Sequence, residues 1–133
     1  MRLLLSSLLL LLLLNACKEH STTLFTRLDE SRTGINFRNL LQEDNPDFNI
    51  LAYPYFYNGS GVAVGDINND GLPDLCFTGN MVKNRLFINK GDFNFEDITA
   101  QSHIADKEGW CTGVTMVDIN NDGWLDKIGR AHV

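Results

Sequence analysis

The sequence predicts an all-β protein built from β-propeller blades, with about one and a half repeats present. The stretch 66–74 recurs almost letter for letter as 118–126, so the leading aspartates of the two copies lie 52 positions apart. Short segments rich in β-branched and aromatic residues flank these stretches. Four short strands per unit, at a period of roughly 40–50 residues, are typical of propeller blades.

The first unit divides into four expected strands separated by turns. Apolar and β-branched residues precede and follow the first repeated stretch, and the fourth segment alternates apolar with polar residues, as a half-buried strand does. Polar and glycine-containing stretches separate these segments and predict turns. The expected strands are 61–65, 75–78, 85–89 and 93–98, and the second unit opens with another at 110–117.

Each repeated stretch has the composition of a calcium loop. Side chains with oxygen atoms stand at its first, third, fifth and ninth positions, with glycine at the sixth. A hard divalent cation needs several oxygens from one tight loop and a glycine where the backbone bends sharply, and the seventh residue can lend its carbonyl. The predicted ligands are Asp66, Asn68, Asp70, Leu72 and Asp74 in the first loop, and Asp118, Asn120, Asp122, Trp124 and Asp126 in the second.

Two alternatives compete with this interpretation. An EF-hand requires glutamate at the twelfth loop position, where this chain has Phe77 and Gly129, and Pro73 disfavours a helix after the first loop. A turn without metal remains open, because Asn, Asp and Gly dominate turns in general. The repetition of the same ligand positions favours calcium.

Residues 1–16 have the pattern of a signal peptide, with Arg2 followed by a leucine-rich run too short to span a bilayer. The run ends before Cys17 in a way that resembles the lipobox of bacterial lipoproteins, which predicts acyl chains on this cysteine and membrane anchoring. Lys18 and Glu19 resemble signals that send lipoproteins to the outer face of the outer membrane. An ordinary secretory signal cut near Ala16 is the alternative.

Residues 17–52 are predicted as a polar tether and lead-in whose apolar residues pack in part. The aromatic cluster at 53–57 favours a core at a strand entry over a sugar-stacking platform. Cys76 and Cys111 could pair in an oxidising compartment or stay free as small buried hydrophobes. The sequence leaves the pairing open.

The repeat resembles the FG-GAP or VCBS family in residues 61–75, 84–89 and 95–99. This is the calcium-binding β-propeller repeat also seen in integrin alpha subunits, and its bacterial members include exported proteins ending in an ASPIC/UnbV domain. The resemblance covers about 53–126 and implies calcium binding by the loop aspartates and asparagines. The sequence lacks an ASPIC/UnbV domain and contains one full repeat plus the start of a second.

The last six residues have a separate interpretation. A widely used short-read sequencing adapter, translated in one frame, gives the same residues as 128–133, followed by a stop codon. We therefore expect 53–127 to be a truncated repeat region and 128–133 to be adapter sequence.

Composition and motifs restrict the classes of function that we expect for this chain. A net charge of −6 and a pI near 4.8 argue against nucleic acid as a partner. None of the histidines, His20, His103 and His132, belongs to a catalytic or metal spacing, and no nucleophile elbow or phosphate loop is present, so we expect no enzyme activity in this chain.

We expect a calcium-binding segment of a lipid-anchored surface protein that binds or adheres to a glycan or a surface protein. The alternatives are the scaffold of a larger secreted hydrolase with catalytic residues elsewhere, and a structural partner of an outer-membrane complex.

Overall fold

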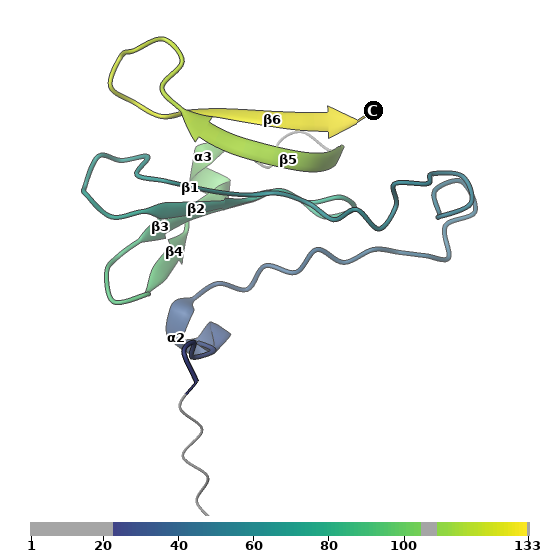
Figure 1. The fold of residues 1–133 in the computed structure, drawn as a ribbon, viewed down its shortest axis with the longest axis horizontal. Helices are drawn as coiled ribbons and strands as arrows, with labels where there is room; N and C mark the ends of the chain where they lie inside the picture. Colours follow the sequence, from purple (N-terminus) through teal and green to yellow (C-terminus); the bar gives the residue numbers. More distant parts are fainter. Residues whose placement is uncertain (1–22, 105–108, 133) are drawn as a thin grey trace, which may run out of the picture.

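The computed structural model describes residues 23–104 and 109–132, and its fold is all-β, as the sequence predicts (Figure 1). The predicted signal peptide and Cys17 lie outside the described residues. One sheet has four antiparallel strands in the order β1-β2-β3-β4: β1 (Val62–Gly65), β2 (Asp74–Phe77), β3 (Arg85–Asn89) and β4 (Phe95–Asp97). The second sheet is a hairpin of β5 (Trp110–Val117) and β6 (Asp126–His132).

The four-stranded sheet is a meander in which each strand pairs with the next along the chain, the arrangement of one propeller blade. The observed β3 and β5 have the predicted bounds. The start of β2 moves to Asp74 because this residue pairs with Gly65 at the end of β1. The predicted strand 93–98 is wrong at its start, because Asp92 and Phe93 have φ values of 50° and 56°, outside the extended region.

Two single-turn helices accompany the strands, α2 (Glu30–Thr33) and α3 (Thr99–Ser102). The sequence did not predict either one. Within residues 23–104 and 109–132, no helix has the length and apolar character needed to cross a membrane.

Strand β6 follows the second repeated loop although the sequence has no apolar strand there. It pairs with β5 from Val117 opposite Asp126 to Trp110 opposite His132, with an irregularity between Cys111 and Gly113. Backbone groups supply this ladder, and every non-proline residue has them. The origin of residues 128–133 therefore stays a prediction.

One face of the meander packs on the β5–β6 hairpin. The buried centre consists of Ala63, Cys76 and Leu86, and half-buried residues of both units surround it: Ile67, Ile98, Ile104, Val114 and Met116. Glycines in and before β1 permit this close approach. A Cβ atom on Gly61 would lie 2.8 Å from the backbone nitrogen of Val114, and one on Gly65 would lie 2.6 Å from Cδ1 of Leu125.

The N-terminal segment covers part of the other face. The ring of Phe37 stacks on Phe77 with centroids 5.1 Å apart, and Phe77 meets the fully buried Phe87 edge-on at 5.7 Å. Part of the lead-in thus packs on the sheet, as predicted. Val62 and Val64 on this face are 55% and 60% exposed.

The aromatic cluster divides between core and surface. Phe56 is fully buried, with its ring 5.4 Å from that of Trp110, whereas Tyr55 and Tyr57 are exposed. The core interpretation therefore holds for Phe56 but not for these two tyrosines. Cys76 is buried and Cys111 is half-buried, and both thiols are free.

Candidate metal centre

The two repeated loops occupy equivalent places in the structure. One connects β1 to β2 and the other connects β5 to β6, and in Figure 1 both extend from the same side of the molecule. They touch where the side-chain amide of Asn69 donates a hydrogen bond of 3.1 Å to the backbone carbonyl of Gly123. The loops therefore form one continuous region.

The leading aspartate closes each loop in the same way. The carboxylate of Asp66 accepts hydrogen bonds from the backbone N–H groups of Asp70 (3.1 Å) and Gly71 (2.7 Å). In the second loop, Asp118 accepts the equivalent bonds from Asp122 (3.0 Å) and Gly123 (2.9 Å). The first and fifth loop positions are thus brought together in both copies.

The third and fifth positions also repeat their contacts. The amide nitrogen of Asn68 donates to Oδ2 of Asp70 at 2.9 Å, and Oδ1 of Asp70 accepts from the backbone N–H of Leu72 at 2.9 Å. The second loop has the same two bonds, each 2.9 Å long, around Asp122. The structure thus gathers the predicted ligands at positions one, three and five into one small turn.

Two positions in each loop have left-handed backbone conformations. The glycines at the sixth position, Gly71 and Gly123, have φ values of 86° and 88°, as the calcium interpretation requires. At the fourth position, Asn69 and Asn121 both have φ of 58°, which we did not anticipate. The available signal was the residue type, because asparagine adopts this conformation more readily than most residues.

The ninth position has a different environment. Asp74 is fully buried, and its carboxylate accepts hydrogen bonds from the backbone N–H groups of Ile67 (2.9 Å) and Asn89 (2.8 Å). Asp126 keeps the first of these, from Ile119 at 3.1 Å. Two backbone donors can stabilise a buried carboxylate without a cation. Asp74 therefore links the loop to β3 by hydrogen bonds, and its role as a calcium ligand stays a prediction.

Asn89 is a residue of this region that the sequence did not single out. Its side-chain amide donates to the carbonyl of Pro73 at 3.0 Å, and its side-chain oxygen accepts from the backbone of Gly91 at 2.9 Å. The only signal was a polar residue at the end of an otherwise apolar strand. Its importance comes from the proximity of β3 to the loop.

The donor atoms in the loops suit calcium because all of them are oxygens. Among the described residues, however, no three Asp, Glu, His or Cys side chains come together in a way that could hold a metal ion. A cation in the first loop would therefore depend on the side-chain oxygen of Asn68 and the carbonyl of Leu72, and in the second on Asn120 and Trp124. The donor chemistry fits, and a turn closed by its own hydrogen bonds remains the alternative.

Comparison with known proteins supports the predicted FG-GAP-like repeat but not the predicted relationship to bacterial lipoproteins. Residues 66–128 match the FG-GAP-like repeat family. The chain is 37% identical to cartilage acidic protein 1 of Xenopus tropicalis over 76 residues, which are 57% of this chain and 12% of that protein. It is 34% identical to the Homo sapiens protein of the same name over 71 residues, 53% of this chain and 11% of that protein.

The chain thus spans only a small part of the curated relatives that it matches. No solved structure matches it. These relatives are eukaryotic, and the comparisons give no evidence for the predicted kinship with bacterial ASPIC/UnbV lipoproteins.

Proposed function

We propose, from the FG-GAP-like repeat as the premise, that this chain is a calcium-binding β-propeller segment that serves ligand binding or adhesion at a cell surface. The observation that carries the proposal is the identical hydrogen-bonded conformation of the two loops, with the same residue types at each ligand position. The asparagine at position three and the aspartate at position five close each turn by hydrogen bonds, and they also place oxygen atoms at the same positions in both loops, as two equivalent cation sites require.

The loops have an architectural role in this proposal. Their hydrogen bonds set the ends of β1 and β2 and of β5 and β6, and Asn69 links one loop to the other. A bound calcium ion would supply the positive charge that offsets repulsion among the loop carboxylates. Ordered loops then hold the hairpin against the meander, which keeps the surfaces around them in a constant arrangement.

The same contacts support a non-catalytic role. The carboxylates of Asp66, Asp70 and Asp74 all accept hydrogen bonds from backbone N–H groups of the loop or of β3. Carboxylates oriented in this way are suited to act as hydrogen-bond acceptors and metal ligands. We therefore place the function of the chain in binding, with a glycan or a surface protein as partner.

The cell-surface part of the proposal depends on the sequence around Cys17. We propose that acyl chains on this cysteine anchor the exported protein to the membrane. Expression with labelled palmitate in a bacterial host tests this, with Cys17→Ser as the matched variant. Label in the parent chain and none in the variant supports the anchor, whereas equal labelling, or none in either, contradicts it.

Calcium binding is tested by isothermal titration of the purified chain. We expect two equivalents of calcium with Kd of about 10⁻⁴–10⁻³ M, the range of extracellular modules. Asp66→Asn and Asp118→Asn keep the side-chain shape and remove one charge, so each is expected to abolish one equivalent.

The control for this titration is Asp92→Asn, which removes an exposed carboxylate outside both loops. We expect it to leave both equivalents in place. Circular dichroism on every variant shows whether the strands are retained. Absence of saturable binding in a folded chain would establish the metal-free turn instead.

A further inference from the structure

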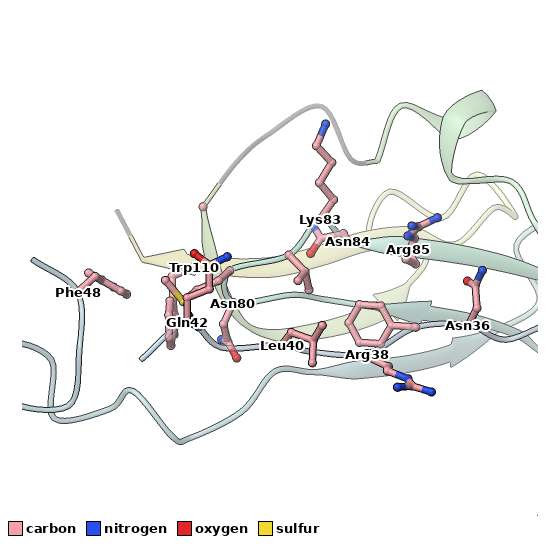
Figure 2. Close-up of a pocket in the computed structure, with 14 residues that line it drawn as sticks. Asn36, Arg38, Leu40, Gln42, Phe48, Asn80, Lys83, Asn84, Arg85 and Trp110 are labelled. Carbon is pink, nitrogen blue, oxygen red and sulfur yellow. Dashed lines mark hydrogen bonds between the residues drawn. The ribbon is translucent and has the colours of Figure 1, made fainter. Parts of the chain in front are cut away.

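A cleft of about 920 Å³ lies at the end of the meander opposite the repeated loops. Three parts of the chain line it: the N-terminal segment from Asn36 to Phe48, the β2–β3 connection together with the first residue of β3, Arg85, and Gly109 with Trp110, the first residue of β5 (Figure 2). Its volume is in the range of sites that enclose small ligands.

The cleft is positively charged in a chain of negative net charge. Arg38, Lys83 and Arg85 line it, and none of its lining residues is Asp or Glu. Arg85 forms an ion pair with Asp97, in which Nη1 and Oδ2 lie 2.7 Å apart. Arg38 and Lys83 are exposed and form no ion pair with any residue that the structure describes. Two unpaired cations from separate segments thus flank the cleft, and Figure 2 shows that their side chains extend in opposite directions, so an anionic ligand that contacts both has to be an extended one.

One end of the cleft is aromatic. Phe48 meets Trp110 edge-on with ring centroids 4.9 Å apart. Trp110 is 5% exposed, and its indole N–H is buried without a hydrogen-bond partner in the described part of the chain. Buried tryptophan N–H groups usually have a partner, because leaving one unpaired costs free energy. Because this N–H is buried, Trp110 forms a wall of the cleft, and its indole signal can report on changes there.

The amide side chains around the cleft fall into two groups. Asn80 and Asn84 are buried, and their side chains already form hydrogen bonds within the protein. The Asn80 amide donates to the carbonyls of Gly59 and Cys111, and the Asn84 oxygen accepts from the backbone N–H of Gly79. They hold the β2–β3 connection in place. By contrast, the side chains of Asn36 and Gln42 are exposed at the cleft, where they can exchange hydrogen bonds with hydroxyl groups.

We infer that this cleft binds an anionic oligosaccharide, whose sugar rings carry carboxylate or sulfate groups, and this inference rests on the proposed ligand-binding function. The half-buried ring of Phe48 can pack on the C–H face of a sugar ring, the exposed amides bind hydroxyls, and Arg38 and Lys83 pair with the acidic groups. An extended peptide is disfavoured as the ligand. Extended peptides bind by adding to the edge of a strand, and most of the residues that line this cleft lie outside strands.

The test compares three probes of similar length on the purified chain: hexagalacturonate, the neutral maltohexaose, and hexaglutamate. Binding is followed in ¹⁵N-labelled protein, with the indole N–H cross-peak of Trp110 as the site-specific signal. We expect saturable binding of hexagalacturonate that moves this peak, and at least tenfold weaker binding of the other two probes.

Two sets of variants accompany the probes. Arg38→Gln combined with Lys83→Gln removes both free cations and is expected to weaken hexagalacturonate binding at least tenfold. Lys90→Gln is the control, because Lys90 is an exposed lysine paired with Glu96 and does not line the cleft. It is expected to bind like the parent chain.

Equal binding of hexagalacturonate by the double variant and the parent chain would overturn the inference, as would equal binding of maltohexaose. Tighter binding of hexaglutamate would assign the cleft to an acidic peptide and overturn it as well. Calcium titration of a separate sample without hexagalacturonate, whose own carboxylates bind calcium, separates the two proposals. A chain that binds calcium but not hexagalacturonate contradicts only this inference, and a chain that binds neither contradicts both.

Discussion

The side-chain amide of Asn69 donates a hydrogen bond of 3.1 Å to the backbone carbonyl of Gly123, which joins the fourth position of the first loop to the sixth position of the second. The two units are thus connected at their loops as well as through the core around Ala63 and Cys76. Asn121 occupies the equivalent place in the second loop, with the same φ of 58°, and makes no such bond with the described residues.

This pair allows a matched test of the contact between the loops. Asn69→Gly and Asn121→Gly both retain the left-handed backbone and relieve the same strain, so their difference reports the hydrogen bond. We expect Asn69→Gly to lower the free energy of unfolding by about 0.5–1 kcal/mol relative to Asn121→Gly. Urea denaturation measures the difference. Equal stability of the two variants would show that the loop contact contributes nothing.

A methyl group added at Gly61 or Gly65 would lie between the two sheets, and we expect the two additions to lower the free energy of unfolding by different amounts. In Gly61→Ala the new Cβ meets the backbone of Val114 at 2.8 Å, which cannot move alone, whereas in Gly65→Ala it meets the end of the Leu125 side chain at 2.6 Å. We expect a loss of about 1–3 kcal/mol for Gly61→Ala and a smaller loss for Gly65→Ala. Thermal unfolding of both variants checks the order, and the reverse order would mean that the hairpin packs differently.

The thiol of Cys76 is expected to react slowly in the folded chain. It is fully buried, and burial raises its pKa, an effect that Lys127 partly opposes and Cys111 reinforces. Since the thiolate is the reactive form, alkylation by iodoacetamide should be far slower in buffer than in urea. Mass spectrometry of the Cys111→Ser variant follows Cys76 without interference from the neighbouring thiol. A disulfide between the two in the parent chain would contradict the free thiols of the structure.

The ion pair between Arg85 and Asp97 predicts a dependence of stability on pH. Burial acts to raise the pKa of Asp97, but hydrogen bonds from Thr99 and the charge of Arg85 outweigh it and lower the pKa overall. A lowered pKa contributes stability above the unfolded value of about 3.9, and this stability is lost as pH falls through the folded value. We expect Asp97→Asn to cost about 0.5–1 kcal/mol at pH 7 and less below pH of about 4.

Denaturation at pH 7 and at pH 3 measures this effect, with Glu96→Gln as the control. Glu96 pairs with Lys90 at 3.0 Å, but both side chains are about half exposed, so solvent screening leaves the pair little energy. A cost for Asp97→Asn that does not change with pH would show that packing, and not charge, accounts for its contribution.

Local signals in the sequence were sufficient for the repeat and for most strands. The β-branched and aromatic residues of β3 and β5 placed these strands at their observed bounds, because pairing and burial there agree with local preference. The start of β4 could not be predicted, since Phe93 suits a strand by residue type but adopts a left-handed conformation in the preceding turn. The helix α3 was also missed, because four residues carry too little pattern to recognise.

The sequence by itself determined the all-β class and the loop positions that carry oxygen atoms and glycine, because these depend on residue type and spacing over a few residues. Only the tertiary structure decided that Asp74 is buried between Ile67 and Asn89 and that Asn69 reaches Gly123. It alone also brought Arg38, Lys83 and Trp110 to one cleft. These contacts join residues far apart in the chain, and their formation depends on how the strands pair and the sheets pack.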